Sequence, residues 1–246
     1  AAFESDYEIG RFVDVAPALG VDSLNLCGGV IVEDFDNDGD LDLYIVQGKD
    51  DMGNSLFENI GGTFVNRSVG SGADDKGYGI GVTTGDYDGD GDVDLYVTNI
   101  GVNALLRNDG NGKFTDVTTF SGTEDEGFSA CSAFGDLDGD GDLDLVVTKY
   151  LDVALITDRE CLDARSQRTY CNPTIYDAPM HDSLFINNGD GTFTDTTMQS
   201  GIGAVQGTGL GVFIAELTND EYPDIFIAND AMPDRLWVNQ GDGTFV

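Results

Sequence analysis

The stretch Asp86-Tyr-Asp-Gly-Asp-Gly-Asp-Val-Asp94 decides the fold, because two further copies of it occur in the chain. The other copies read Asp34-Phe-Asp-Asn-Asp-Gly-Asp-Leu-Asp42 and Asp136-Leu-Asp-Gly-Asp-Gly-Asp-Leu-Asp144. Every copy holds five aspartates and has glycine at its sixth place. An acidic run that only keeps a surface solvated needs no fixed spacing, so this pattern indicates a specific structure.

Carboxylates packed this densely repel one another unless a cation lies between them. Ca²⁺ accepts six to eight oxygens at about 2.3–2.6 Å, and glycine permits the sharp turn that wraps a loop around the ion. Mg²⁺ retains more of its water, so calcium is the expected ion. We expect side chains at places one, three, five and nine, with the backbone carbonyl at place seven, to bind it. The predicted ligands are Asp34, Asp36, Asp38, Asp40 and Asp42; Asp86, Asp88, Asp90, Asp92 and Asp94; and Asp136, Asp138, Asp140, Asp142 and Asp144.

An EF-hand would have a glutamate at place twelve and a helix on either side of the loop. Place twelve is instead occupied by Ile45, Val97 and Val147. Short runs rich in β-branched and aromatic residues flank the loops, as in Val93-Asp-Leu-Tyr-Val-Thr98, and these runs are typical of strands. The loops therefore join strand to strand.

A longer period surrounds the loops, since Asp34 and Asp86 are 52 residues apart and Asp86 and Asp136 are 50 apart. A second recurring motif follows each loop, as in Asn103-Ala-Leu-Leu-Arg-Asn108. A sequence typical of a hairpin turn, such as Gly110-Asn-Gly-Lys-Phe114, comes next. Four strands in about 50 residues predict a propeller blade with the calcium loop between its first and second strands. A β-sandwich is the alternative, but it does not explain the recurrence. Alternating glycines in Gly77–Gly85 suit a crowded inner strand.

A fourth, weaker unit follows, in which the loop reads Glu216-Leu-Thr-Asn-Asp-Glu-Tyr-Pro-Asp224. Glutamate replaces the glycine of the sixth place and threonine replaces one acid, so a fourth ion would be held more weakly or not at all. Its candidate ligands are Glu216, Thr218, Asp220, Tyr222 and Asp224. The predicted repeats span residues 21–70, 71–121, 122–200 and 201–246, with residues 1–20 contributing the last strand of a preceding or ring-closing blade.

The third repeat contains an insertion at 150–181 that holds Cys161, Cys171 and the only histidine, His181. Nine residues separate Cys161 from Cys171, and we expect a disulfide between them that restrains the inserted loop. Cys27 and Cys131 fall on first strands of two non-adjacent blades, and we expect them to be buried free thiols.

The chain resembles the FG-GAP/VCBS repeats of integrin α-like propellers, most closely the ASPIC/UnbV, cartilage-acidic-protein-like branch. The resemblance rests on the aspartate loops, the second recurring motif and Tyr170-Cys171-Asn-Pro173. This resemblance implies a secreted or cell-surface, calcium-loaded, non-catalytic propeller of about seven blades. Two departures are the absence of an ASPIC/UnbV domain and the presence of only four repeats. Arg11-Phe-Val-Asp-Val15 resembles the last strand of a blade, which is consistent with a fragment of a larger ring, with closure of a small ring, or with strand addition to a second molecule.

Composition limits the function classes further. The formal charge is −35, which argues against nucleic acid and anionic membranes as partners, and no apolar run is long enough to span a membrane. The leading hypothesis is an extracellular, cell-surface or periplasmic adhesion module in which structural calcium supports binding to a protein or a glycan. A structural subunit of a surface filament, in contact with neighbouring subunits, is the first alternative. A polysaccharide-active enzyme that uses His181 and Asp182 is the second, and we expect no catalytic residues because most clustered acids are committed to ions.

Overall fold

The computed structural model describes residues 12–22, 27–49, 51–156 and 160–246. Its regular structure is nearly all β, and its α-helices are the single turns α1 (Ala16–Leu19) and α2 (Thr118–Ser121) among the described residues. None of the described helices has the length or the apolar content needed to cross a lipid bilayer.

Four antiparallel units, called units 1 to 4, follow one another along the part of the chain that the structure describes. Unit 1 comprises β1 (Cys27–Glu33), β2 (Asp42–Gln47), β3 (Ser55–Ile60) and β4 (Thr63–Asn66), paired in that order. Unit 2 comprises β5 (Tyr78–Gly85), β6 (Asp94–Val102), β7 (Ala104–Asn108) and β8 (Phe114–Asp116). Each acidic loop joins the first strand of its unit to the second, as the sequence predicts.

Units 3 and 4 repeat this order with changes. Unit 3 comprises β9 (Glu126–Gly135), β10 (Asp144–Lys149), β13 (Ser183–Asn187) and β14 (Phe193–Asp195). Unit 4 comprises β15 (Gly209–Ala215), β16 (Asp224–Asn229) and β17 (Arg235–Trp237), and a bridge between Asn239 and Phe245 stands where a fourth strand would pair. The turn η2 (Ile202–Ala204) leads into unit 4. The strands lie within the predicted repeat ranges, although the boundaries themselves stay predictions.

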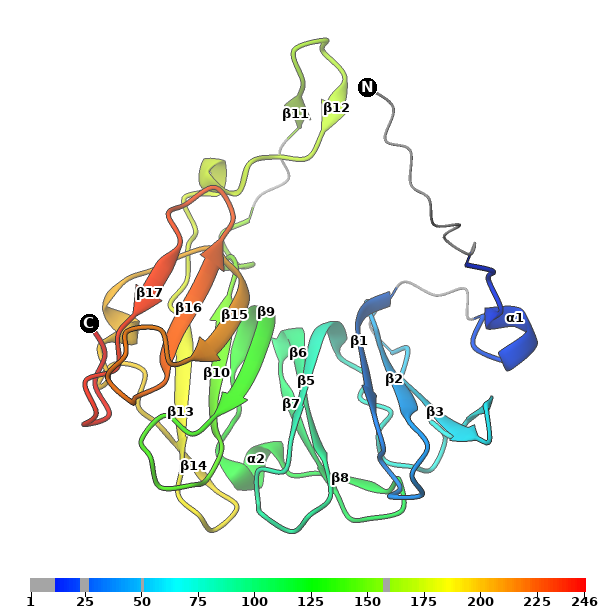
Figure 1. The fold of residues 1–246 in the computed structure, drawn as a ribbon. Coiled ribbons are helices and arrows are strands. Elements are labelled where there is room, and N and C mark those ends of the chain that lie inside the picture. Colours follow the sequence, from blue (N-terminus) through cyan, green and yellow to red (C-terminus); the bar gives the residue numbers. More distant parts are fainter. Residues whose placement is uncertain (1–11, 23–26, 50, 157–159) are drawn as a thin grey trace, which may run out of the picture.

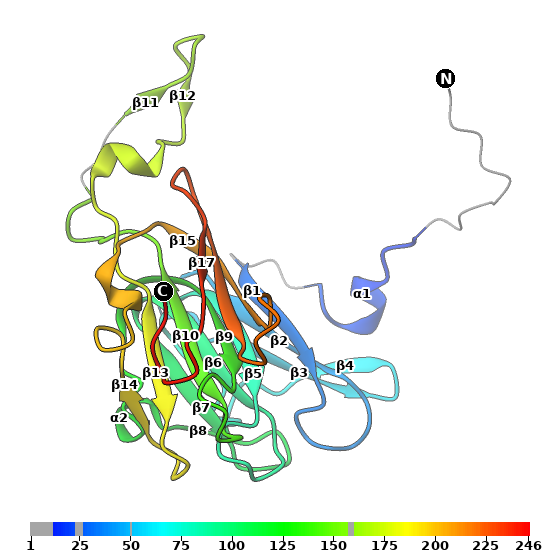
Figure 2. The ribbon, with the colours of Figure 1, turned by 60° about the vertical axis from the view of Figure 1, so that its left-hand side comes forward.

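The units follow an arc that is open on one side (Figure 1), and a second view shows them stacked side by side (Figure 2). First strands of neighbouring units contact one another, and the far ends of β6 and β9 even pair directly. Units 1 and 4 lie at opposite ends of the arc (Figure 1), so these four units do not close a small ring.

Glycines let the first strands approach closely. A β-carbon on Gly28 would lie 2.6 Å from the carbonyl oxygen of Ile80, and one on Gly81 would lie 2.8 Å from that of Ala130. Both distances are shorter than real β-carbon contacts. The alternating glycines are therefore required by backbone approach at the inner edge, which confirms the interpretation of that pattern.

Among the described residues, three hydrophobic cores lie between the units, not inside them. Tyr44 of unit 1 packs in one cluster with Leu95 of unit 2. Tyr96 and Phe185 belong to the cluster between units 2 and 3, and a third cluster contains Trp237 of unit 4. Each unit thus buries its apolar faces only by stacking on a neighbour, which is the behaviour expected of a blade.

The strand predicted over Arg11–Val15 is only partly within the described residues, and it stays a prediction. Residues 12–15 belong to no strand, and the chain enters helix α1 directly after them. A strand needs a neighbour that accepts its backbone hydrogen bonds, and no described strand lies beside this segment.

The insertion of unit 3 projects from the body as a hairpin of β11 (Cys161–Leu162) and β12 (Arg168–Thr169), followed by the turn η1 (Pro173–Tyr176) (Figure 1). A disulfide joins Cys161 to Cys171 with their α-carbons 5.3 Å apart, which confirms the predicted pairing. Cys131, on β9, is free as expected but half-exposed, so its predicted burial was wrong. The side chain of Cys27 lies outside the described residues.

Candidate metal centres

The backbone of each acidic loop folds around its first aspartate. In unit 1, Asp34 accepts hydrogen bonds from the backbone N–H groups of Asp38 at 3.1 Å and Gly39 at 2.9 Å. Asp86 of unit 2 does the same for Asp90 at 3.1 Å and Gly91 at 3.0 Å. The glycine of the sixth place has a φ of 94° in both loops, a left-handed conformation that side chains disfavour. The spacing therefore produces a tight turn that brings successive side chains to one side.

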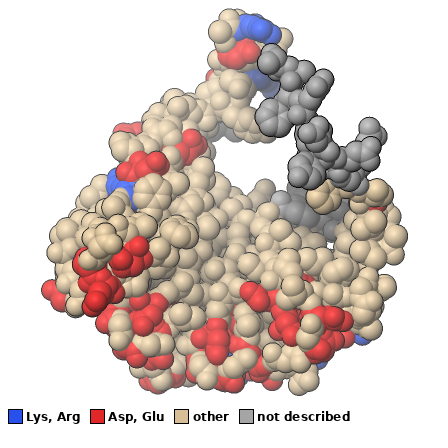
Figure 3. Space-filling model, viewed as in Figure 1, with Lys and Arg blue, Asp and Glu red and all other residues tan. Residues whose placement is uncertain are grey.

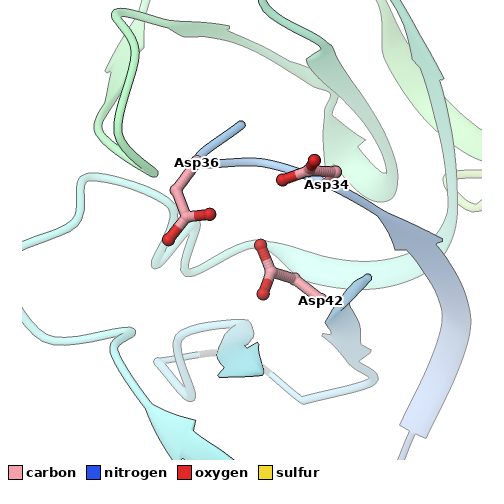
Figure 4. Close-up of side chains that lie close together, drawn as sticks. All are labelled: Asp34, Asp36 and Asp42. Carbon is pink, nitrogen blue, oxygen red and sulfur yellow. The ribbon is translucent and has the colours of Figure 1, made fainter. Parts of the chain in front are cut away.

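Three groups of carboxylates converge among the described residues. Each group offers oxygens that all lie within 4.8 Å of one another. Two oxygens bound to one calcium ion at about 2.3–2.6 Å can be separated by up to about 5 Å, so the spacing fits Ca²⁺. Figure 4 shows the carboxylates of the first group turned toward a common point. The groups are Asp34, Asp36 and Asp42; Asp86, Asp88 and Asp90; and Asp136, Asp138 and Asp144.

Side chains at the first and third places therefore converge in all three loops, whereas those at the fifth and ninth places converge in only some of them. Asp90, at the fifth place, joins its group, whereas Asp38 and Asp140 at the same place do not. At the ninth place, Asp42 and Asp144 join, whereas Asp94 does not.

Side chains at the seventh place point away from the groups, toward the neighbouring hairpin turn. Asp40 accepts a hydrogen bond from the N–H of Gly61 at 3.1 Å. A β-carbon on Gly110 would lie 3.1 Å from Oδ2 of Asp92, and one on Gly189 would lie 2.7 Å from Oδ2 of Asp142. The role predicted for the backbone carbonyl at this place stays a prediction.

Aspartates at the ninth place have a second role that the sequence did not reveal. In unit 2, Asp94 accepts the N–H of Tyr87 at 3.1 Å with Oδ2 and that of Asn108 at 2.7 Å with Oδ1. The same pair of bonds recurs at Asp42, Asp144 and Asp224. Because a carboxylate can accept about four hydrogen bonds, lone pairs remain for an ion. The ninth aspartate therefore ties the loop to the following hairpin.

The electrostatics of the loops favour a cation. Burial raises the pKa of Asp94 and of Asp144 to about 7, against the opposing effect of their backbone hydrogen bonds and with help from the neighbouring loop carboxylates. Burial also raises the pKa of Asp36, Asp88 and Asp138, again with charge repulsion from loop neighbours. A divalent ion would offset this repulsion. Acidic side chains also gather along the edge of the molecule on which the loops lie (Figure 3).

The loop of unit 4 does not converge. Its four acids Glu216, Asp220, Glu221 and Asp224 form no group of the kind found in the other loops of the described chain. Glu216 instead accepts a hydrogen bond from the N–H of Thr218 at 2.8 Å. Glu221 adopts a φ of 77° where the other loops have glycine. Tyr222 packs against Gly241, and Thr218 is exposed.

Neighbouring units are linked beside the loops by the last asparagine of the second recurring motif. The Nδ2 of Asn108 donates to the carbonyl oxygen of Phe35 in the unit before it, at 2.9 Å. Asn187 donates in the same way to Tyr87 at 2.8 Å, and Asn239 donates to Leu137 at 2.7 Å. The repetition of this asparagine in the sequence indicated a functional or structural role, but its hydrogen-bond partner could not be deduced from the motif.

A buried ion pair lies at the opposite end of unit 3. Lys149 is 2% exposed and binds Asp125 at 2.7 Å, and its Nζ also donates to Ser129 at 2.9 Å. Nearby, Asp182 accepts the backbone N–H of Lys149, so one carboxylate oxygen of the predicted His181–Asp182 pair is already engaged. His181 is half-exposed, and its Nδ1 is buried without a partner among the described atoms.

Comparison with known families identifies the repeats. Residues 34–97 and 86–147 match the FG-GAP-like repeat family. The two matches share the acidic loop of unit 2 and together take in the loops of units 1 to 3. Among curated proteins, none matches this sequence.

Two solved structures resemble the chain in fold. One is a lectin of Agrocybe aegerita, described as recognising non-reducing terminal N-acetylglucosamine, with a TM-score of 0.48 and 21% identity over 87% of this chain and 49% of that one. The other is the V. cholerae biofilm matrix protein Bap1, with a TM-score of 0.42 and 16% identity over 92% of this chain and 40% of that one. The chain spans less than half the length of either structure.

Proposed function

We propose that this chain, whose residues 34–147 are FG-GAP-like repeats, is a calcium-loaded interaction module that binds a glycan or a protein outside the cytoplasm. The observation that carries the proposal is the convergence of carboxylates in three consecutive loops at a spacing that suits calcium. Calcium has a structural role in this proposal, because it neutralises each loop and fixes the turn between two strands. The match to the narrower ASPIC/UnbV branch stays a prediction.

The disulfide supports a location outside the cytoplasm. Disulfides such as Cys161–Cys171 persist in oxidising compartments and are rare where thiols are kept reduced. Extracellular calcium is millimolar, and sites with dissociation constants of about 10⁻⁴–10⁻³ M are filled there. We therefore expect the loops to be occupied on the cell surface, in the secreted protein or in a periplasm.

A propeller larger than four units is also part of the proposal. Phe226 and Leu236 of unit 4 are 37% and 44% exposed, whereas their repeat equivalents in unit 2, Tyr96 and Leu105, are fully buried against unit 3. The outer face of unit 4 therefore has the composition of a face that stacks on another unit. We infer a ring of about seven blades, to which these four contribute.

We propose no catalytic activity. Nine acids belong to the three converging groups, and Asp182 is engaged by backbone. Replacement of His181 with alanine separates the two classes, because a binding module keeps its ligand affinity and an enzyme loses turnover.

Calcium titration of the metal-free full chain tests the main proposal. We expect three bound ions by isothermal titration calorimetry, one for each converging group, and a large rise in melting temperature, which EDTA reverses. A melting temperature that is indifferent to both calcium and EDTA, with no heat of binding, would falsify the proposal. Magnesium at the same concentration is the control, and it should give a much smaller effect.

A further inference from the structure

The outer surface between units 1 and 2 is hollowed by a groove of about 370 Å³, called groove A. Its walls include Asp36 of the first acidic loop, Glu58 of β3 and Arg67 after β4, all from unit 1. Unit 2 contributes Asn111 and Lys113 from the turn between β7 and β8. A groove of this size is within the range that small ligands occupy.

A matching groove of about 330 Å³, called groove B, lies between units 3 and 4. It contains Asp138, which holds the same place in its loop as Asp36. The other equivalent positions follow from aligning the repeats on the last asparagine of the second recurring motif and on the hairpin phenylalanine. The equivalent pairs, groove B residue first, are Ile186 and Glu58, Thr196 and Arg67, Asp242 and Asn111, and Thr244 and Lys113.

The two grooves differ in charge. Groove A holds two of the chain's 11 basic residues, whereas the lining of groove B has no basic residue. Lysine and arginine are scarce in this chain, and here one from each of two units faces the same space. The repeat alone does not require them, because groove B has threonine at both places.

Both cations of groove A are accessible. The side chain of Arg67 is 52% exposed and forms an ion pair with Glu58 through Nε, which is one of five N–H donors on a planar guanidinium. Lys113 is exposed, and its Nζ donates to the carbonyl oxygen of Gly70 at 3.1 Å. Arginine suits bidentate recognition of a carboxylate, and lysine adds a point charge.

The charge around the groove depends on the metal. Three carboxylates line it, those of Asp36, Asp42 and Glu58, and Asp34 completes the converging group beside them. Against the two cations of the groove, these four carboxylates give a net charge of −2 without metal, which one divalent ion cancels. An anionic ligand is therefore repelled less by the calcium-loaded form.

We propose that groove A binds the carboxylate of a uronic acid residue in a calcium-dependent manner, with Arg67 and Lys113 pairing the carboxylate. This assignment rests on the proposed function and names the ligand class of that function. A sugar fits the rest of the lining, because the Asn111 amide and the Glu58 carboxylate offer a donor and acceptors for ring hydroxyls.

Saturation-transfer NMR on the full chain tests the proposal, with glucuronate, glucose and N-acetylglutamate as probes. We expect saturation of glucuronate in about 2 mM calcium and its loss in EDTA, with little signal from glucose. Arg67→Thr and Lys113→Thr, which install the groove B residues, should each weaken glucuronate binding about tenfold, since each removes a charge-assisted hydrogen bond. Lys76→Thr removes an exposed positive charge outside the groove and should leave binding unchanged.

Calcium titration of the same samples separates the possible failures. Calcium binding without any glucuronate signal would overturn the assignment of groove A alone, and so would a signal that survives in both threonine variants. A response to N-acetylglutamate equal to that of glucuronate would overturn the sugar in favour of a peptide carboxylate. Absence of calcium binding would overturn both the groove and the proposed function. The threonine variants should keep the wild-type melting temperature, because both side chains are exposed.

Discussion

The side-chain amide of Asn108 donates to the backbone carbonyl oxygen of Phe35, 73 residues earlier in the chain, at 2.9 Å. The same Nδ2 donates at 3.2 Å to the carbonyl oxygen of Val93, in the acidic loop of its own unit. Phe35 and Val93 are the second and eighth residues of two successive loops. One buried amide therefore holds two candidate metal loops in fixed relation, and the stability of one loop depends on its neighbour.

Replacement of Asn108 with alanine should destabilise the protein by about 2 kcal/mol, because two buried carbonyl groups lose their donor. Urea denaturation in calcium measures this change in the free energy of unfolding. Asn59→Ala is the matched control, since Asn59 occupies the same place in unit 1 and donates at 3.0 Å only to Leu41 of its own loop. Equal losses in the two variants would contradict the role of the cross-unit bond.

Replacement of Gly81 with alanine should destabilise the protein by about 1–3 kcal/mol through overpacking, because the new β-carbon would lie 2.8 Å from the carbonyl oxygen of Ala130. Gly211→Ala is the control on the corresponding strand of unit 4, where the new β-carbon would meet nothing closer than 4.0 Å. Thermal unfolding of both variants checks the difference. If Gly81→Ala melts like the wild type, the inner strands do not need their close approach.

The sixth place of the acidic loops allows a paired test of backbone strain. Glu221→Gly should stabilise unit 4 by about 1 kcal/mol, because glycine adopts the φ of 77° without a steric penalty. Gly91→Ala, the opposite change in unit 2, should destabilise by a similar amount, and no atom lies within 4 Å of the new β-carbon to complicate the comparison. Urea denaturation of the metal-free protein gives both values, and a destabilising Glu221→Gly would show that the glutamate side chain compensates for its strain.

The sequence predicted the repeating parts of the molecule well, because each rests on local chemistry. Strand, acidic loop, strand and hairpin recur with a period that could be counted, and glycine at the sixth place predicted the turn at Gly91. The alternating glycines around Gly81 likewise indicated close backbone approach.

Contacts between repeats could not be predicted from the sequence, because they depend on how the units stack. The bond from Asn108 to Phe35 joins residues that no local pattern connects. Groove A exists only where the turn of one unit meets the outer strands of another. The strand predicted at residues 11–15 stays a prediction for the related reason that a strand depends on a partner, which the motif does not supply.

Within the candidate site, Asp138→Asn should reduce the number of bound calcium ions from three to two, because the third group loses one of three converging charges. Calorimetric titration measures the stoichiometry directly. Asp190→Asn is the control, since Asp190 lies in the exposed hairpin turn, where it accepts the N–H of Thr192 at 3.1 Å. Three ions bound by Asp138→Asn would show that the group in unit 3 is not the binding site.

Asp182 should make the protein less stable as pH rises. Its carboxylate is fully buried, Oδ1 accepts the N–H of Lys149 at 3.0 Å, and Oδ2 has no partner among the described atoms. Burial raises the pKa of Asp182 to about 6, although the backbone hydrogen bond and the charges of Arg235 and Lys149 oppose the shift. Because the folded pKa exceeds the unfolded value of 3.8, the folded state binds the proton more tightly. The stabilisation is complete below pH 3.8 and is lost as pH rises through about 6.

The loss from Asp182 between about pH 4 and pH 8 should amount to about 2.4 kcal/mol, since each unit of pKa shift corresponds to about 1.4 kcal/mol and a small part is already lost at pH 4. Asp182→Asn should remove this part of the pH dependence, and asparagine already stands at the same place in units 1 and 2 as Asn54 and Asn103. Urea denaturation in saturating calcium at both pH values measures the difference, so that contributions from other groups cancel between variant and wild type. Asp234→Asn changes the equivalent but exposed residue of unit 4 and should leave the pH dependence as it is. A parallel slope for Asp182→Asn and the wild type would mean that the ion pair of Lys149 and Asp125, and not Asp182, controls the proton balance of this buried region.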